Sequence, residues 1–164
     1  MDDGAAFRIS RVEGSPELAI ITAGLLDRLP AWFGMAEANA AYAESARDLP
    51  GFLAHGVGGE PIGILLCKRH FAEAAEIHLM AVDPDRHRQG VGAALLAATE
   101  SRLRTEGCLL LHVKTLGPAD PDSAYARTRS FYQAVGFIPI EETHDLWPGN
   151  PCLLMIKMLA SQHP

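Results

Sequence analysis

The segment Arg86–Ala93 combines two glycines with two arginines at the point where an apolar stretch gives way to a helical pattern. Gly90 and Gly92 carry no side chain that would keep an anion from the backbone, and free N–H groups at a helix start attract negative charge. Arg86 and Arg88 add positive charge nearby. The segment therefore predicts a phosphate-type site, and an ordinary glycine helix start with surface arginines is the alternative that these residues leave open.

Two better-known phosphate loops do not fit this segment. A Walker A loop needs Gly-Lys followed by Ser or Thr, and no such residues follow Gly92. A dinucleotide-binding fold needs a small residue where Leu95 stands. It also needs an acidic residue at the end of the next strand, where the chain has His112-Val113-Lys114.

Glu76 and His78 are candidates for proton transfer. They lie two residues apart in a segment predicted to be a strand, so their side chains share one face of the sheet. A half-buried glutamate with a raised pKa could accept the proton of an amine through a water molecule. The alternative is a solvent-facing Glu76 with His78 as its hydrogen-bonded neighbour.

The elements that must position these residues alternate between strands and helices. Helix starts and stops follow from signals such as Ser15-Pro16-Glu17 and Gly136, and Gly56–Glu60 is typical of a hairpin turn. Strands are predicted over 7–12, 52–55, 61–68, 76–82, 108–114, 137–140 and 152–159, and helices over 15–29, 37–48, 90–105 and 125–135. We therefore expect a single α/β domain over residues 1–164. It should have a mixed, mostly antiparallel sheet of about seven strands, about four helices and one β-α-β crossover.

Composition narrows the range of partners. The 164 residues include 14 basic and 20 acidic ones, a net charge of −6, which argues against nucleic acid as the main partner. Residues up to Val82 carry a balance of −5, whereas Arg86–Lys114 carries +3. No apolar stretch reaches the length of about 18 residues that a membrane span needs, and the N-terminus lacks an apolar signal region. We expect a cytoplasmic protein without a membrane partner.

Cysteines and histidines give no sign of a metal site. Three widely spaced cysteines, Cys67, Cys108 and Cys152, form no C-x-x-C pair and are expected to be buried, reduced thiols. The histidines outside the segments above show no H-x-x-x-H or H-x-E grouping, so no metal is expected; they are His55, His70, His112, His144 and His163.

Over about residues 61–137 the chain resembles the GNAT superfamily of acyl-CoA-dependent N-acetyltransferases. The family signature, Arg/Gln-x-x-Gly-x-Gly/Ala after the fourth strand, matches His87-Arg88-Gln89-Gly90-Val91-Gly92, with His87 at the first position. The strand over residues 76–82 is similar to the family's fourth strand. The run Ser130–Phe137 is similar to its Phe-Tyr-x-x-x-Gly-Phe segment. Tyr125 stands where many members carry an Asn that contacts pantetheine.

The resemblance implies a role for each of these residues. In the family, backbone N–H groups of the loop hold the coenzyme pyrophosphate, and the separating fourth and fifth strands hold pantetheine and the acetyl oxygen. The implied coenzyme-binding residues are Leu79, Met80, Ala81, Val82, His87, Arg88, Gln89, Gly90, Val91, Gly92 and Ala93. Tyr132 corresponds to the tyrosine that protonates the leaving thiolate. Ala75-Glu76-Ile77 is similar to the segment in which histone-type acetyltransferases keep their glutamate base, with His78 as the second candidate.

The function that the resemblance implies is acetyl transfer from acetyl-CoA to an amine by direct transfer in a ternary complex. A non-catalytic acyl-CoA-binding or regulatory module is the alternative. The acceptor is expected to be a small molecule or a peptide amine, with a cationic one favoured by the acidic N-terminal half. A homodimer is compatible with this assignment. The aromatic loops at Trp32-Phe33-Gly34 and Trp147-Pro148-Gly149 are candidates for lining the acceptor pocket, and ordinary packing is their alternative role.

Overall fold

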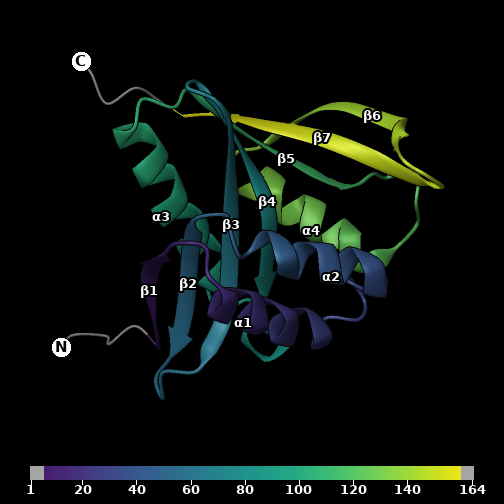
Figure 1. Cartoon of the computed structure of the whole chain (residues 1–164). Helices are drawn as coiled ribbons and strands as arrows, with labels where there is room; N and C mark the ends of the chain where they lie inside the picture. Colours follow the sequence, from purple (N-terminus) through teal and green to yellow (C-terminus); the bar gives the residue numbers. More distant parts are fainter. Residues whose placement is uncertain (1–5, 160–164) are drawn as a thin grey trace. The chain divides into compact units, whose positions relative to one another are not determined.

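Residues 6–159 are described by a computed structural model as an alternation of strands and helices (Figure 1). The elements in chain order are β1 (Phe7–Val12), α1 (Pro16–Asp27), α2 (Ala36–Ser45), β2 (Gly51–Gly56), β3 (Pro61–Phe71), β4 (Ala74–Val82), the 3₁₀ helix η1 (Pro84–Arg86), α3 (Val91–Thr105), β5 (Leu110–Leu116), α4 (Ser123–Ala134), β6 (Ile138–Trp147) and β7 (Asn150–Met158). The chain divides into two compact units. Within the described residues, the first holds 6–68 with Leu79–Ser101, and the second holds Arg69–His78 with 102–159.

In the first unit, β1 pairs with β2 and β2 with β3, all antiparallel. Helix α1 begins as its sequence predicts, because the Ser15 side chain accepts a hydrogen bond of 3.0 Å from the Leu18 N–H and proline occupies the first turn. Its inner face packs with the strands in one apolar core. The largely inaccessible residues of this core include Leu18, Leu25, Leu26, Leu53, Ile64, Leu66, Leu79 and Ala81. Truncating a fully buried leucine such as Leu26 to alanine should cost about 2–5 kcal/mol.

In the second unit, Ala74–Ile77 of β4 pair in parallel with Leu110–Val113 of β5, and β7 pairs antiparallel with both β5 and β6. The hydrogen-bonded strand order is β1-β2-β3-β4-β5-β7-β6. The prediction of an α/β fold with a seven-stranded, mostly antiparallel sheet, four helices and one parallel crossover is therefore confirmed.

Three predicted boundaries differ from the structure by three residues or more. The strand predicted over residues 61–68 is β3, which continues to Phe71. The strand predicted over residues 137–140 is β6, which continues to Trp147, so the Trp147-Pro148-Gly149-Asn150 segment is a tight hairpin turn and not a long loop. Most of β6 is exposed, and its polar run lacks the apolar alternation that would mark a strand; pairing with β7 holds it. The helix predicted over 37–48 ends at Ser45, because residues 46–48 form turns.

All three cysteines are free thiols, as expected, but only Cys108 and Cys152 are buried and Cys67 is partly exposed. Burial raises the pKa of the Cys152 thiol above its ordinary value, which suits a packed and unreactive side chain. Within residues 6–159, no helix is long and apolar enough to cross a membrane.

Candidate functional site

The loop between β4 and α3 leads into a helix start whose first backbone N–H groups have no acceptor within the helix. The Gly90 carbonyl accepts the first helical hydrogen bond, from the Ala94 N–H at 3.0 Å, so the amides of the three preceding residues, Val91, Gly92 and Ala93, belong to the first turn. Such amides have no acceptor inside their own helix. Because the positive end of the helix dipole lies at the same place, this turn is suited to an anion such as a phosphate.

Backbone conformation explains the glycine at the start of this turn. Gly90 has φ +83°, in the left-handed region that favours glycine, and a Cβ placed there would meet open space. Arg88 also has a positive φ, +63°, and is the one non-glycine residue of the described chain that does. The loop therefore needs glycine at position 90 for its backbone angles and not for lack of room.

The entry to the loop is anchored by α1. Arg28, at the C-terminal end of α1, pairs with the buried Asp83 carboxylate and, at 3.1 Å, with Asp85. Asp83 in turn accepts a 2.9 Å hydrogen bond from the Asp85 N–H, which starts the 3₁₀ helix. Sequence reasoning missed this anchor, because Arg28 and Asp83 are far apart in the chain.

Several predicted coenzyme-binding side chains are used within the loop itself. His87 lies 2.7 Å from the Val82 carbonyl through Nε2, and its ring meets the Trp32 ring edge-on at 5.2 Å. Gln89 donates a 2.9 Å hydrogen bond to the Asp85 carbonyl. The Arg88 side chain is exposed, whereas Arg86 pairs with Glu60 at 3.3 Å. A ligand at this loop would therefore be bound mainly by the backbone and by Arg88, because the side chains of His87 and Gln89 already contact backbone carbonyls.

The end of β4 has two different faces. Leu79 and Ala81 are buried in the core of the first unit, whereas Met80 and Val82 are partly exposed. The register that pairs β4 with β5 covers Ala74–Ile77, although β4 continues to Val82. Within the predicted stretch, Leu79 and Ala81 therefore have only their backbone groups available to a ligand.

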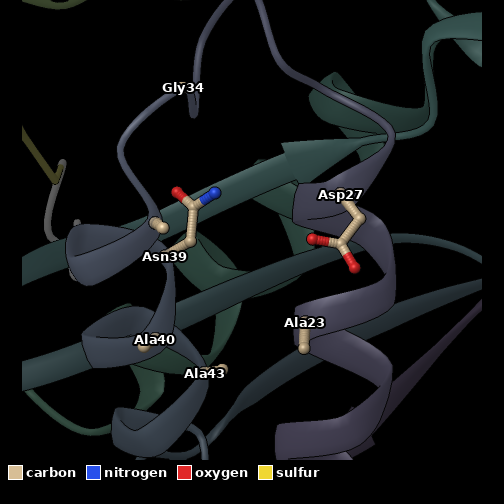
Figure 2. Close-up of a pocket in the computed structure, with 7 residues that line it drawn as sticks. Ala23, Asp27, Gly34, Asn39, Ala40 and Ala43 are labelled. Carbon is tan, nitrogen blue, oxygen red and sulfur yellow. The ribbon is translucent and has the colours of Figure 1, made fainter.

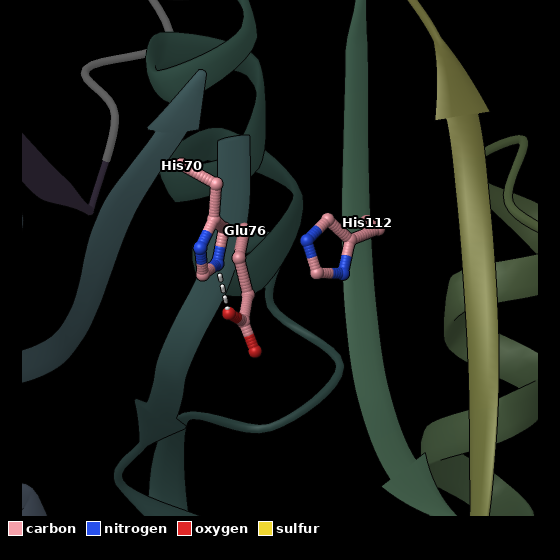
Figure 3. Close-up of side chains that lie close together, drawn as sticks. All are labelled: His70, Glu76 and His112. Atoms are coloured by element: carbon pink, nitrogen blue, oxygen red, sulfur yellow. Dashed lines mark hydrogen bonds and ion pairs between the residues drawn. The ribbon is translucent and has the colours of Figure 1, made fainter. Parts of the chain in front are cut away.

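Glu76, the predicted base, lies in the second unit and is buried, with 7% of its surface exposed. Its two carboxylate oxygens have separate partners. His70 Nε2 lies 2.6 Å from Oε2 (Figure 3), and Lys114 Nζ lies 3.2 Å from Oε1. Burial by itself would raise the pKa of Glu76. The hydrogen bonds from His70 and Lys114, with the Lys114 charge, outweigh it and hold the pKa below its ordinary value. The expectation of a raised pKa was wrong for this reason.

His112 completes this cluster. It stands directly opposite Glu76 in the parallel register of β4 and β5, and its ring centre lies 5.4 Å from that of His70. Its Nδ1 atom is buried and has no hydrogen-bond partner within residues 6–159. Burial lowers the pKa of His112, which keeps the ring neutral. One ligand atom each from His70, Glu76 and His112 lies within 4.8 Å of the others, a grouping that the spacing of the histidines did not indicate.

The other two candidates also lie in the second unit. His78 follows Glu76 on the same face of β4 and is partly exposed. Tyr132, on α4, is 4% exposed and packs edge-on against Phe131 and Phe137, with ring centres 5.4 and 5.3 Å away. The ring of Tyr132 is therefore part of the core, and any chemistry would be done by its hydroxyl.

A pocket of about 330 Å³ lies between α1 and α2 (Figure 2). Asp27 lines it from α1, with its carboxylate turned toward α2, and Asn39 lines it from the opposite side. Asn39 Nδ2 donates a 2.7 Å hydrogen bond to the Phe33 carbonyl, whereas Oδ1 is buried without a partner in the described part of the chain. Of the two aromatic loops, only Gly34 reaches this lining, since Trp32 and Phe33 pack against the core.

Comparison with known proteins identifies a family. The sequence model of one protein family, the acetyltransferase (GNAT) domain, matches residues 50–139 of the chain. No curated protein sequence matches the chain.

Solved structures share the fold at low sequence identity. The ribosomal-protein-S18-alanine N-acetyltransferase from Escherichia coli has a TM-score of 0.75 at 18% identity, covering 96% of this chain and 96% of that protein. Ard1 from Thermoplasma volcanium has a TM-score of 0.73 at 20% identity, covering 95% and 99% respectively. An aminoglycoside 6'-N-acetyltransferase solved with coenzyme A has a TM-score of 0.72 at 16% identity, covering 96% and 99%.

Proposed function

The chain belongs to the GNAT acetyltransferase family, and from that premise we propose that it is an N-acetyltransferase. It moves an acetyl group from acetyl-CoA to an amine by direct transfer in a ternary complex. The observation that carries the proposal is the first turn of α3, where the amides of Val91, Gly92 and Ala93 follow a left-handed Gly90. This turn binds the coenzyme pyrophosphate, with Arg88 beside it, and the backbone of Leu79–Val82 binds pantetheine and the acetyl oxygen.

Transfer requires one proton to leave the amine and one to reach the thiolate. The neutral amine nitrogen attacks the thioester carbonyl carbon, a C–N bond forms and the C–S bond breaks. Glu76, or His78 in its place, takes the proton from the amine, and the Tyr132 hydroxyl gives a proton to the departing coenzyme sulfur. A carboxylate with a lowered pKa is a weaker base than the sequence suggested. In this proposal Glu76 takes the proton through a water molecule.

The acceptor is a cationic amine, either a small molecule or a peptide. The position of Asp27 supports this. A negative charge in the last turn of a helix is unfavourable by about 0.3–1 kcal/mol, because the C-terminal end of the helix is itself negative. The stability of α1 therefore does not explain the carboxylate. The Asp27 carboxylate lines the pocket between α1 and α2, and the residues up to Val82 carry a balance of −5. Ammonium groups would be concentrated near this carboxylate.

Two observations favour a second candidate, a non-catalytic acyl-CoA-binding or regulatory module. Tyr132 is almost fully buried, and both oxygens of Glu76 are occupied by His70 and Lys114. A module of this kind would keep the loop before α3 and bind the coenzyme without turnover. For both candidates we propose a cytoplasmic protein of one domain, compatible with a homodimer, whose partners include neither nucleic acid nor membrane.

The deciding experiment measures binding and turnover separately. Melting temperature is recorded with CoA and acetyl-CoA, and thiol release is then followed with a panel of polyamines, aminoglycosides, lysine peptides and neutral amines. Ligand at about 100 times its dissociation constant should stabilise the fold by about 2.7 kcal/mol. Binding with amine-dependent thiol release supports the enzyme, binding without release supports the module, and no shift at millimolar coenzyme overturns both.

A further inference from the structure

The cluster around Glu76 combines donor atoms that the chemistry above does not fully use. His70 comes from the end of β3, Glu76 from β4 and His112 from β5, and all three belong to the second unit (Figure 3). We propose that His70, Glu76 and His112 form a binding site for a divalent transition-metal ion of the zinc type.

The donor set fits this class of ion. Two imidazole nitrogens and one carboxylate oxygen are ligands for Zn²⁺, Co²⁺ or Ni²⁺, whereas Mg²⁺ and Ca²⁺ prefer oxygen alone. Ligands at about 2.0–2.1 Å in tetrahedral geometry lie about 3.3 Å apart. The three donors span distances from 2.6 Å, between His70 and Glu76, to at most 4.8 Å. Side-chain shifts of about 1 Å complete three ligand positions and leave the fourth for water.

His112 turns one ring nitrogen into the cluster. The nitrogen that faces the Glu76 and His70 side chains is Nε2, whereas Nδ1 lies on the other side of the ring (Figure 3). Nδ1 is buried without a hydrogen-bond partner among residues 6–159, so the available donor toward the cluster is Nε2.

The ammonium group of Lys114 would lower the affinity of this site for a metal cation. Its ammonium lies 3.2 Å from Oε1 of Glu76, whereas His70 contacts Oε2. The metal can therefore take Oε2 while Oε1 keeps its bond to Lys114, in the way that metal-bound carboxylates are hydrogen-bonded elsewhere. Repulsion between the ammonium and a divalent ion about 5 Å away should weaken binding about tenfold, even at the dielectric constant of water.

The same contacts also form an ion network that would exist without any metal. The two explanations differ in the effect of Lys114: a network loses a stabilising partner when Lys114 becomes neutral, whereas a metal site gains affinity. A metal on Oε2 would also keep the carboxylate from accepting a proton, so Zn²⁺ should inhibit acetyl transfer. This last consequence rests on the proposed function, but the binding itself does not.

The test uses the full chain after treatment with a chelator, and it needs neither coenzyme nor acceptor. ZnCl₂ and MgCl₂ are titrated by calorimetry, and Co²⁺ is followed by the visible absorption of a tetrahedral site. The variants are His70→Gln, which changes an exposed residue, His112→Gln and Lys114→Gln. His144→Gln is the matched control, because His144 is an exposed histidine outside the cluster.

One Zn²⁺ should bind per chain, and Mg²⁺ should not compete. Either histidine variant should weaken Zn²⁺ binding at least tenfold, since even the partners of ligands contribute ten- to a hundredfold. Lys114→Gln should strengthen binding about tenfold, and His144→Gln should leave it unchanged. The proposed site would be overturned by any of three results. Zn²⁺ fails to bind at millimolar concentration, both histidine variants still bind Zn²⁺ with unchanged affinity, or Lys114→Gln weakens the binding. None of these results would affect coenzyme binding, which tests the proposed function separately.

Discussion

The loop before α3 and the Glu76 cluster differ in the kind of charge that each holds. The loop presents backbone N–H groups, which carry only partial charge and therefore cost little to expose to an incoming anion. The cluster holds a full negative charge where only 7% of the residue is exposed, and it must be compensated by His70 and Lys114 on the spot. The loop is thus ready for a ligand as it stands, whereas any ligand or proton entering the cluster must displace an existing contact.

Because of this difference, we expect a substitution in the Glu76 cluster to reduce turnover more than a substitution in the loop. Glu76→Gln keeps the size of the side chain and removes its charge and its basicity. Turnover should fall about a hundredfold or more at neutral pH, since a general base contributes about 10²–10⁴-fold. The loss should be smaller at high pH, where more of the acceptor is already a free amine.

Glu73→Gln is the control for this substitution, because Glu73 is an exposed glutamate in the turn that joins β3 to β4. It should leave turnover unchanged. Melting temperatures of both variants separate a chemical loss from a structural one. If Glu76→Gln is folded and fully active at every pH, the base is His78 or water, and the cluster has no part in the reaction.

The two regions also differ in how far sequence could predict them. The loop is encoded by consecutive residues, because a left-handed Gly90 and the start of α3 depend on local backbone preferences. The cluster depends on the parallel register that sets Glu76 opposite His112, and on a hairpin that returns His70 to Glu76. No local pattern specifies that register. The lowered pKa of Glu76 could not be foreseen for the same reason, since it comes from residues up to 38 positions away.

Tyr132 tests whether a motif found by local pattern also has a chemical role. Tyr132→Phe keeps the ring and its packing on Phe131 and Phe137 but removes the hydroxyl. The chemical step should slow about ten- to a hundredfold, measured as single-turnover thiol release, and coenzyme affinity should be unchanged. Tyr42→Phe on α2 makes the same chemical change elsewhere and should leave the rate unaltered. A large loss of stability with an unchanged rate would show that the hydroxyl is structural.

Gly90 and Gly59 offer a matched pair for the loop. Both have a positive φ, +83° and +86°, and a Cβ at either would meet nothing within 4 Å. Gly90→Leu and Gly59→Leu should each lose about 1–2 kcal/mol of stability for the left-handed backbone. Only Gly90→Leu should also lose coenzyme affinity, about tenfold, because a side chain next to the first turn of α3 hinders the approach of the pyrophosphate. Equal affinities in the two variants would place the coenzyme elsewhere.

The smallest effect is expected at the pocket between α1 and α2, where Asp27 is exposed and its attraction for an ammonium is screened by salt. Asp27→Asn should raise the KM for a cationic acceptor about two- to fivefold and leave kcat unchanged, since an exposed ion pair contributes about 0.2–1 kcal/mol. Raising the salt concentration should bring the wild-type KM toward that of the variant. Asp48→Asn, which makes the same change at an exposed aspartate outside the pocket lining, should have neither effect. An acceptor whose KM is indifferent both to salt and to Asp27→Asn would be recognised by something other than charge, and the acidic balance of the first 82 residues would then have no bearing on the choice of acceptor.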